Sequence, residues 1–261
     1  MELSVVREIE EVSARAWPPL EQRDVDGWVL RAGGGVTGRA NSVWPRAEHG
    51  GLPLDEKLAA AGEFYAEREL PLLIQLAPTA RPVGLADELI SRGYGIARAA
   101  RTVQVAELDG VVAVGDASRA DISGVVSGTW YDVVAQVNSS FEQHRRAARA
   151  LLDGVAQPSA FALVTLDGAP AAAGRGVSDG DWLGVFNMAT LPAYRRQGCA
   201  AAVLAALAVW ARDHGAKRAY LQMDGDNTAA PALYARAGFT PCYEYAFWGK
   251  TYPTRPTVCR P

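Results

Sequence analysis

The sequence predicts an α/β protein that consists of two tandem copies of one folding unit. Segments with the hydrophobic spacing of helices and of strands alternate along the whole chain. The chain has 261 residues, of which 49% are hydrophobic. That is enough for a core, and it exceeds the roughly 100–150 residues of a typical single domain. One interval also recurs, because Pro45 stands thirty residues before Gln75 and Pro192 stands thirty residues before Gln222.

The first half is expected to begin with a helix over residues 4–16, in which Val5, Ile9 and Val12 share one face. Trp17 and the two prolines after it end this helix. Apolar runs bounded by glycine, proline and polar residues predict the elements that follow. We expect strands at 26–30, 41–44, 72–76 and through 103–105, and helices at 55–70 and 85–92.

The second half begins after Asp109-Gly110, so the predicted domains are 1–110 and 111–261. Its hydrophobic patterns again alternate between the helical and the extended period. We expect helices at 120–134, 141–152, 200–211 and 229–237, and strands at 160–166, 171–177, 182–189, 218–223 and 239–248. The last helix of each half ends in a glycine followed by an aromatic residue, Gly93-Tyr94 and Gly238-Phe239. We interpret the two halves as a tandem duplication.

The loop over 195–201 carries most of the chemical information. It lies between a predicted strand and the start of a predicted helix, where backbone N–H groups are free and the helix dipole attracts anions. Gly198 and Ala200 lack bulk, so a ligand can approach the backbone, and Arg195 and Arg196 add positive charge. These features together indicate a site for a diphosphate.

Two motifs in the second half resemble those of the GNAT acyltransferase superfamily. The first is Arg-x-x-Gly-x-Ala, from Arg195 to Ala200, and the second is Asn-x(6)-Tyr-x(3)-Gly-Phe, from Asn227 to Phe239. The resemblance covers Val111 to about Lys250. It implies that each unit is a mixed, mostly antiparallel twisted sheet flanked by helices. It also implies an acetyl-CoA-dependent N-acetyltransferase, in which a primary amine attacks the thioester directly in a ternary complex. The tandem layout is similar to that of mycothiol synthase and of uncharacterised actinobacterial GNAT proteins.

The resemblance also assigns residues to the acetyl donor. Family members splay one strand from its neighbour, and the freed backbone groups pair with the pantetheine arm. The amides opening the following helix hold the diphosphate, and an asparagine contacts the pantetheine, although Asn227 could serve only as a helix cap. The expected cofactor-binding residues are Met188, Ala189, Thr190, Arg195, Arg196, Gln197, Gly198, Cys199, Ala200, Ala201 and Asn227. No metal is expected.

Tyr234 is the expected catalytic residue, because the resemblance makes its hydroxyl the acid that protonates the departing thiolate. Its alternative is a core tyrosine with a satisfied hydroxyl. The base that accepts the proton of the amine is less well marked. Asp224 and Glu244 are candidates on predicted neighbouring strands, and a water chain or a backbone carbonyl are alternatives. Cys199 lies in the loop without an evident base, so we expect it to pack as a small residue.

The first copy is expected to bind no cofactor. In the gapless overlay, Arg195 falls on Glu48 and Ala200 falls on Pro53. A carboxylate repels phosphate and proline has no N–H to donate. We therefore expect this half to be structural or to line the acceptor pocket.

Composition narrows the partners. The net charge of −3 gives no support for a nucleic-acid surface. Three cysteines without metal-ligand spacing suit the reducing cytoplasm, and the N-terminus does not resemble a signal peptide. The longest apolar run, Ala200 to Ala211, is too short to span a membrane. We expect a cytoplasmic monomer or homodimer that binds acetyl-CoA and an amine acceptor.

A small-molecule amine is the favoured acceptor, and two other functions stay open. One is a protein lysine acetyltransferase, for which an acidic groove would accept a basic tail. The other is a non-catalytic acyl-CoA sensor or partner-binding module, which would bind the cofactor without turnover.

Overall fold

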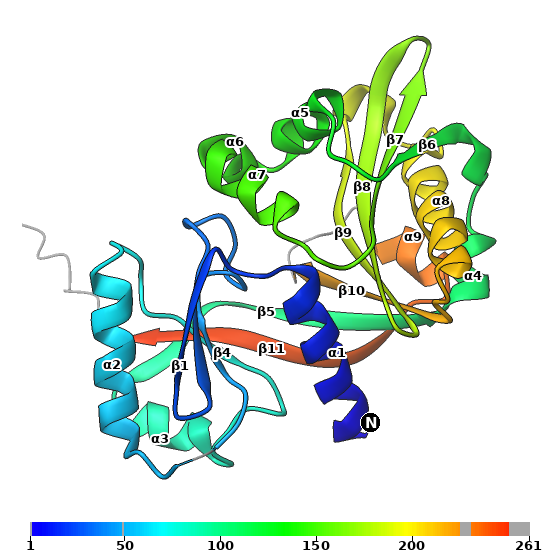
Figure 1. Ribbon diagram of the computed structural model, residues 1–261. Helices are drawn as coiled ribbons and strands as arrows, with labels where there is room; N and C mark the ends of the chain where they lie inside the picture. The colour runs from blue at the N-terminus through cyan, green and yellow to red at the C-terminus, as the bar shows by residue number, and fades with distance from the viewer. Residues whose placement is uncertain (1, 49, 225–230, 251–261) are drawn as a thin grey trace, which may run out of the picture.

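A computed structural model describes residues 2–48, 50–224 and 231–250 of the chain. These residues form one twisted, mixed sheet of eleven strands with helices on both faces (Figure 1), in the order β1-β2-β3-β4-β11-β5-β10-β9-β8-β7-β6. Most neighbouring strands are antiparallel, and β3–β4 and β9–β10 are the parallel pairs among them. The predicted α/β class with a mixed, mostly antiparallel sheet is therefore confirmed.

The N-terminal half packs α2 and α3 beside its strands (Figure 1). Its buried side chains, among them Trp28, Phe64 and Ile74, form a separate cluster. The elements of this half are α1 (Leu3–Ala16), β1 (Glu21–Val25), β2 (Trp28–Ala32), β3 (Val43–Pro45), α2 (Leu54–Ala66), β4 (Ile74–Leu76), α3 (Leu85–Ser91) and β5 (Tyr94–Glu107).

The C-terminal half packs α8 against β7, β8 and β9, because α8 is apolar along most of its length and buries Val203, Leu204 and Leu207 completely. Its helices are α4 (Leu108–Val112), α5 (Gly128–Val137), α6 (Ser139–Gln143), α7 (Arg145–Asp153), α8 (Cys199–Asp213) and α9 (Pro231–Arg236). Its strands are β6 (Ala120–Ser123), β7 (Ser159–Leu166), β8 (Ala169–Asp179), β9 (Trp182–Thr190), β10 (Arg218–Asp224) and β11 (Thr240–Lys250). Short 3₁₀ helices lie at Ala117–Arg119 and Pro192–Tyr194.

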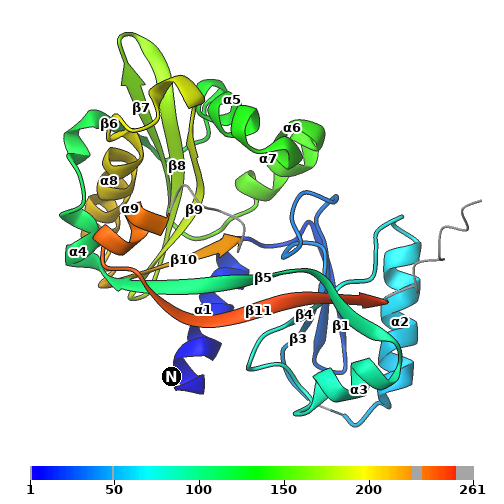
Figure 2. The ribbon, with the colours of Figure 1, turned by 180° about the vertical axis from the view of Figure 1, so that it is seen from behind.

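The two halves exchange strands at the centre of the sheet. β11, the last strand, lies between β4 and β5, and β5 lies between β11 and β10. Figures 1 and 2 show β5 and β11 running side by side across the molecule, from the α9 side to the α2 side. Helix α1 packs over this central region, where Val6 and Ile9 share a buried cluster with Leu73 of the N-terminal half and with aromatic residues of the C-terminal half. The expected division at residue 110 remains a prediction.

Three sequence-based expectations were wrong. The helix expected over 120–134 is in fact strand β6 followed by α5, because 120–123 pairs with β7 at the sheet edge. The strand expected at 26–30 starts at Trp28, because Asp26 and Gly27 have positive φ and form the turn of a hairpin with β1. The strands of Asp224 and Glu244 are not neighbours, because β5 separates β10 from β11.

Among the described residues, no helix is both long enough and apolar enough to cross a membrane.

Candidate active site

A split in the sheet between β9 and β10 is the first feature of the site. The two strands pair in parallel from Trp182 to Val185 on β9, opposite Arg218 to Leu221 on β10. Beyond that point β9 continues beside β8 and β10 continues beside β5. A register shift against β8 and a positive φ of 53° at Asn187 mark a bulge where the strands part. Within the described residues, the edge of β9 that faces the split has no ladder partner after Val185.

The start of α8 is the second feature. Gly198 is its N-cap and has a φ of 79°, which glycine adopts without strain. The loop before it is exposed, and Arg119 donates to the Gln197 carbonyl at 3.3 Å. In the part of the chain that the structure describes, no backbone N–H from 196 to 201 has an acceptor. Cys199 is 1% exposed and belongs to the core, as a packing residue would.

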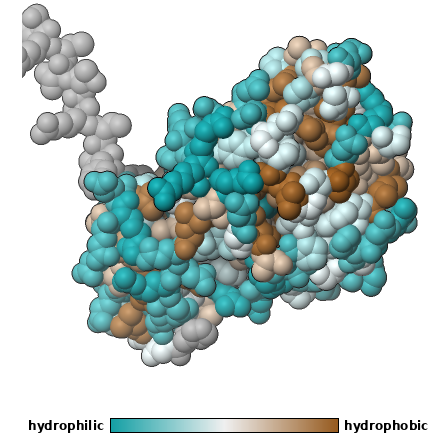
Figure 3. Space-filling view, turned by 45° about the horizontal axis from the view of Figure 1, so that its top comes forward, coloured by the Kyte–Doolittle hydropathy of each residue, from teal (hydrophilic) through white to brown (hydrophobic). Residues whose placement is uncertain are grey.

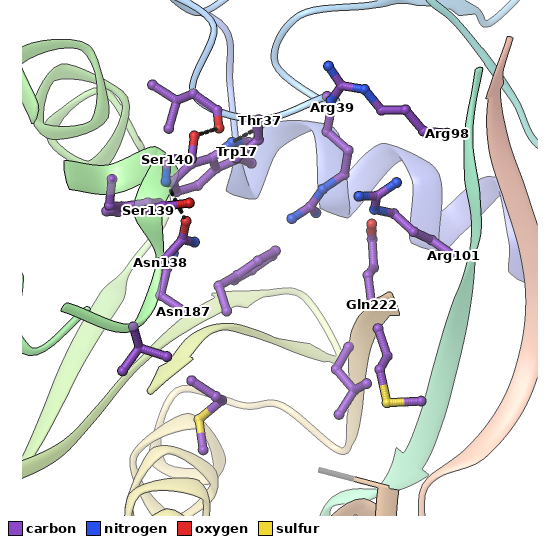
Figure 4. Close-up of a pocket in the computed structure, with 18 of the residues that line it drawn as sticks. Trp17, Thr37, Arg39, Arg98, Arg101, Asn138, Ser139, Ser140, Asn187 and Gln222 are labelled. Atoms are coloured by element: carbon purple, nitrogen blue, oxygen red, sulfur yellow. Dashed lines mark hydrogen bonds between the residues drawn. The ribbon is translucent and has the colours of Figure 1, made fainter. Parts of the chain in front are cut away.

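A cavity of about 720 Å³ extends from the split. On one side it is lined by Met188 of β9, by residues 221–223 of β10 and by Tyr234 of α9. On the other side it is lined by the loop 35–39, by Arg98 and Arg101 of β5 and by residues 137–141. Figure 4 shows the arginines at one part of the cavity wall and Asn138, Ser139 and Ser140 at another. The N-terminal half therefore forms part of its wall.

Tyr234 is the sequence-predicted catalytic residue that lines this cavity. It is 7% exposed and its ring packs edge-on against Phe239, with 5.8 Å between centroids. Burial raises the pKa of Tyr234 to about 12. Its phenol is therefore protonated at neutral pH and can act as a proton donor.

The other residues predicted for the site do not all line the cavity. Met188 lines the cavity, whereas Ala189 and Thr190 continue β9 in pairing with β8. Asp224 ends β10, where its backbone pairs with Arg101. Glu244 is exposed, accepts a hydrogen bond from Thr102 at 3.2 Å and is not part of the cavity lining. Asn227 lies outside the described residues.

The loop from the N-terminal half is fixed by side chains. Asn41 accepts hydrogen bonds from the Gly33 and Gly35 amides at 2.9 and 3.0 Å and donates to the Thr37 carbonyl at 2.7 Å. Ser140 of α6 donates to the Val36 carbonyl. The loop is thereby joined to α6, and it holds Arg39 at the cavity.

A polar network lies where α1 meets the central strands. Gln222 donates to Ser13 at 2.7 Å and accepts from the Tyr245 hydroxyl at 2.6 Å. Deeper in the protein, Tyr243 and Gln75 both donate to the carboxyl group of Glu10. Burial is the main cause that raises the pKa of Glu10, against the opposing effect of these hydrogen bonds and of nearby arginines.

Sequence reasoning missed the arginines of the cavity. Arg39, Arg98 and Arg101 come from a loop and a strand of the half that was expected to bind no cofactor. Arg175 was a visible signal, because it is a charged residue within the otherwise small and apolar run 171–177. In the structure its guanidinium lies between the rings of Trp17 and Phe186, which both line the cavity.

The site fits acetyl-CoA in its chemistry. The open amides at the start of α8 suit a diphosphate, and the unpaired edge of β9 suits a chain of amides. The cavity lies beyond them and is large enough for a small second substrate.

This arrangement defines the class of the protein: a strand split beside a glycine-capped helix, with a protonated tyrosine at the same cavity, is the architecture of a GNAT-type N-acetyltransferase. Comparisons with known proteins agree. A family described as "Probable histone acetyltransferase Rv0428c C-terminal" matches residues 3–248. The chain belongs to this family.

Relatives cover nearly the whole chain. An uncharacterized N-acetyltransferase, YobR of Bacillus subtilis, is 28% identical over 247 residues, which are 93% of this chain and 97% of that protein. A GCN5-related N-acetyltransferase from Kribbella flavida has a similar fold, with a TM-score of 0.64 at 19% identity, over 95% of this chain and 96% of that one. A tandem GNAT protein from the clavulanic acid biosynthesis pathway also has a TM-score of 0.64, at 15% identity, over 95% and 89%. The predicted tandem GNAT layout is thus confirmed at the level of fold.

Proposed function

We propose that the chain transfers the acetyl group of acetyl-CoA to the primary amine of a small molecule by direct attack in a ternary complex. The observation that supports this is the combination of three features, of which the first and the third lie at the cavity. These are the split between β9 and β10, the open amides of α8 and the protonated hydroxyl of Tyr234.

The donor side is assigned to the C-terminal half. The amides of 196–201, with the charges of Arg195 and Arg196, hold the diphosphate, and the backbone of 188–190 pairs with the pantetheine arm. A backbone N–H of the split strand stabilises the negative charge that develops on the thioester oxygen. Acetyl-CoA supplies an activated acyl group in this site.

The proton balance assigns the remaining roles. The amine arrives as an ammonium ion and loses one proton to a base before it attacks. Its lone pair forms the N–C bond while the C–S bond breaks, and the sulfur leaves with the bonding electrons and takes a proton from Tyr234. The nitrogen loses its second proton. One of the two protons that leave the nitrogen restores the Tyr234 phenol, so one proton is released overall. Asp224 is the preferred of the two candidate bases, because its strand β10 borders the split, whereas Glu244 lies on β11, which β5 separates from β10.

The proposal is tested by calorimetry of coenzyme A binding and by release of its thiol in the presence of amines. We expect one molecule bound per chain and turnover with small amines. Binding without turnover by any small amine or lysine peptide would favour the sensor. Turnover confined to lysine peptides would favour a protein acetyltransferase, as the description of the matching family suggests for its members.

A further inference from the structure

The part of the cavity wall that the N-terminal half contributes is cationic. Its described lining contains Arg39, Arg98 and Arg101 and no aspartate or glutamate. Figure 4 shows Arg39 and Arg101 reaching toward the middle of the cavity, with Arg98 nearer its outer edge. We call these three side chains the arginine group.

Among the described residues, Arg39 is held in position without a carboxylate partner. It donates to the Ser13 hydroxyl at 3.3 Å, and its guanidinium carbon lies 5.3 Å from the centroid of the Phe186 ring. In the described part of the chain, neither Arg39 nor Arg98 takes part in an ion pair. Among the described residues the nearby acid Glu10 forms no ion pair, and burial is the main cause that raises its pKa.

A fourth guanidinium adds charge beneath the cavity. Arg175 is 0% exposed, and its carbon lies 4.7 Å from the Trp17 ring and 4.9 Å from the Phe186 ring. It donates to the Ala16 carbonyl at 2.6 Å, while its Nε and Nη1 have no partner among the described residues. A buried cation without a counter-ion is unfavourable for folding, so its retention next to the cavity floor points to a use for the charge.

We propose that the acceptor is a small primary amine that also carries an anionic group, bound by Arg39 together with Arg98 while the amine nitrogen lies at the split between β9 and β10. Guanidinium groups match carboxylate and phosphate through paired N–H donors. The same charges repel a tail rich in lysine and arginine. This inference rests on the proposed acetyltransferase function and names its substrate class.

The face viewed in Figure 3 is largely hydrophilic over the described residues. Hydrophilic residues cover most of that face, and hydrophobic residues are exposed there in small separate groups. A small acceptor that enters the cavity agrees better with this surface than a docked protein does.

Matched pairs of amines test the substrate class directly. The panel contains amino acids with their carboxamides, an aminoalkyl phosphate with the corresponding alkylamine, and a lysine-rich peptide. We expect kcat/KM of the wild-type protein to be at least about tenfold higher for the anionic member of one pair, which corresponds to one charge-assisted contact. Comparison of the amino-acid pairs with the phosphate pair shows whether the site binds a carboxylate or a phosphate. Added salt should reduce this preference.

Two substitutions that each remove one positive charge test whether the preference for the anionic amine arises in the cavity. Arg39→Gln should raise KM for the anionic amine about 10- to 100-fold and leave the neutral partner within about threefold, with unchanged affinity for coenzyme A. Arg212→Gln is the control, because Arg212 is exposed in the last turn of α8 and does not line the cavity. Arg212→Gln should leave KM for the anionic amine and KM for its neutral partner unchanged.

Arg175→Met separates charge from packing. It keeps an unbranched side chain about as long as the aliphatic stem of Arg175 and removes the unpaired cation, so the free energy of unfolding should be maintained or increased. KM for the anionic amine should nevertheless rise. A purely structural arginine would give lower stability without selective loss of the anionic substrate.

Three results would overturn the inference while the proposed function stands. They are equal turnover of the neutral and the anionic member of every pair, equal effects of Arg39→Gln on charged and neutral partners, and turnover of neutral small amines without turnover of any anionic member. Failure to bind coenzyme A would instead overturn the proposed function itself, and the inference with it.

Discussion

At the level of single residues, the proposed reaction depends on the proton of Tyr234. Its ring is buried at the cavity, and burial raises the pKa of its phenol to about 12. The hydroxyl therefore keeps its proton across the pH range in which an amine acceptor begins to lose its own. This suits an acid that assists a leaving thiolate.

Tyr234→Phe should lower kcat by about 10²–10⁴-fold, because it removes only the proton donor. Affinity for coenzyme A, measured by calorimetry, should remain within about twofold. Initial rates of thiol release at saturating amine provide the readout. An unchanged kcat would show that Tyr234 is a core residue whose hydroxyl takes no part in the reaction.

Glu10 gives a pH-dependent prediction for stability. Because burial raises the pKa of Glu10 in the folded protein, the folded state binds this proton more tightly than the unfolded state does. The stability that it contributes is complete below the ordinary value of 4.5 and is lost as the pH rises through the folded-state pKa.

The substitution Glu10→Gln should remove this loss of stability at higher pH. Its unfolding free energy relative to wild type should grow with pH above about 4.5, by at most about 1.4 kcal/mol per pH unit. Urea unfolding at a series of pH values measures the difference. Parallel pH dependences of the two proteins would contradict a raised pKa.

At the residue scale, sequence predicted some positions and missed others for a clear reason. Tyr234 and Met188 were found because motif spacing along one segment marks them, and both line the cavity. Arg39 and Arg101 lie sixty-two residues apart, on a loop and on β5, and the fold brings both to one cavity. No local sequence pattern predicts that two such distant residues line one cavity. The isolated charge of Arg175 in an apolar strand did indicate an unusual buried cation.

At the scale of elements, the N-terminus of α8 carries the diphosphate prediction. Gly198 has a φ of 79°, and a Cβ there would lie 3.1 Å from a nitrogen of Arg119. Gly84 offers a matched control, because it is the N-cap of α3 with a φ of 83° and open space around it.

Gly198→Asp should weaken coenzyme A binding by more than about tenfold, since a carboxylate then faces the phosphates. Gly84→Asp should leave that affinity unchanged. Both variants should lose roughly 1–2 kcal/mol of stability, because a side chain is strained at positive φ. Calorimetry and urea unfolding measure the two effects. Equal affinity of Gly198→Asp and wild type would refute the assignment of this loop.

Periodicity predicted most elements well and failed where an edge or a turn decides the structure. Helix α8 is apolar along one continuous stretch and was expected within a few residues of its bounds. Strand β6 was predicted as helix, because a short edge strand with residues such as Asp121 lacks a clear alternation. Its pairing with β7 is set by the sheet and not by its own sequence.

At the scale of the whole molecule, the exchange of β5 and β11 joins the two halves. β11 pairs with β4 and β5, and β5 pairs with β10. The repeat in the sequence predicted two similar units but not this exchange, because two units of the same pattern offer equivalent edges. The division at residue 110 is therefore proposed as a boundary between repeats and not between independently folding domains.

The full chain should unfold in a single transition. Tryptophans occur in both halves, so fluorescence reports on the whole molecule, and circular dichroism should give the same urea midpoint. A fragment of residues 1–110 lacks β11 and should remain unfolded by both probes. Two separated transitions of the full chain would contradict joint folding of the halves.

The most direct measurement for the account as a whole is a crystal structure of the chain with coenzyme A. We expect density for one molecule per chain, with its diphosphate against the amides of 196–201 and its thiol end at the split near Tyr234. A diphosphate bound at the start of α2, beside Glu48 and Pro53, would contradict the central claim.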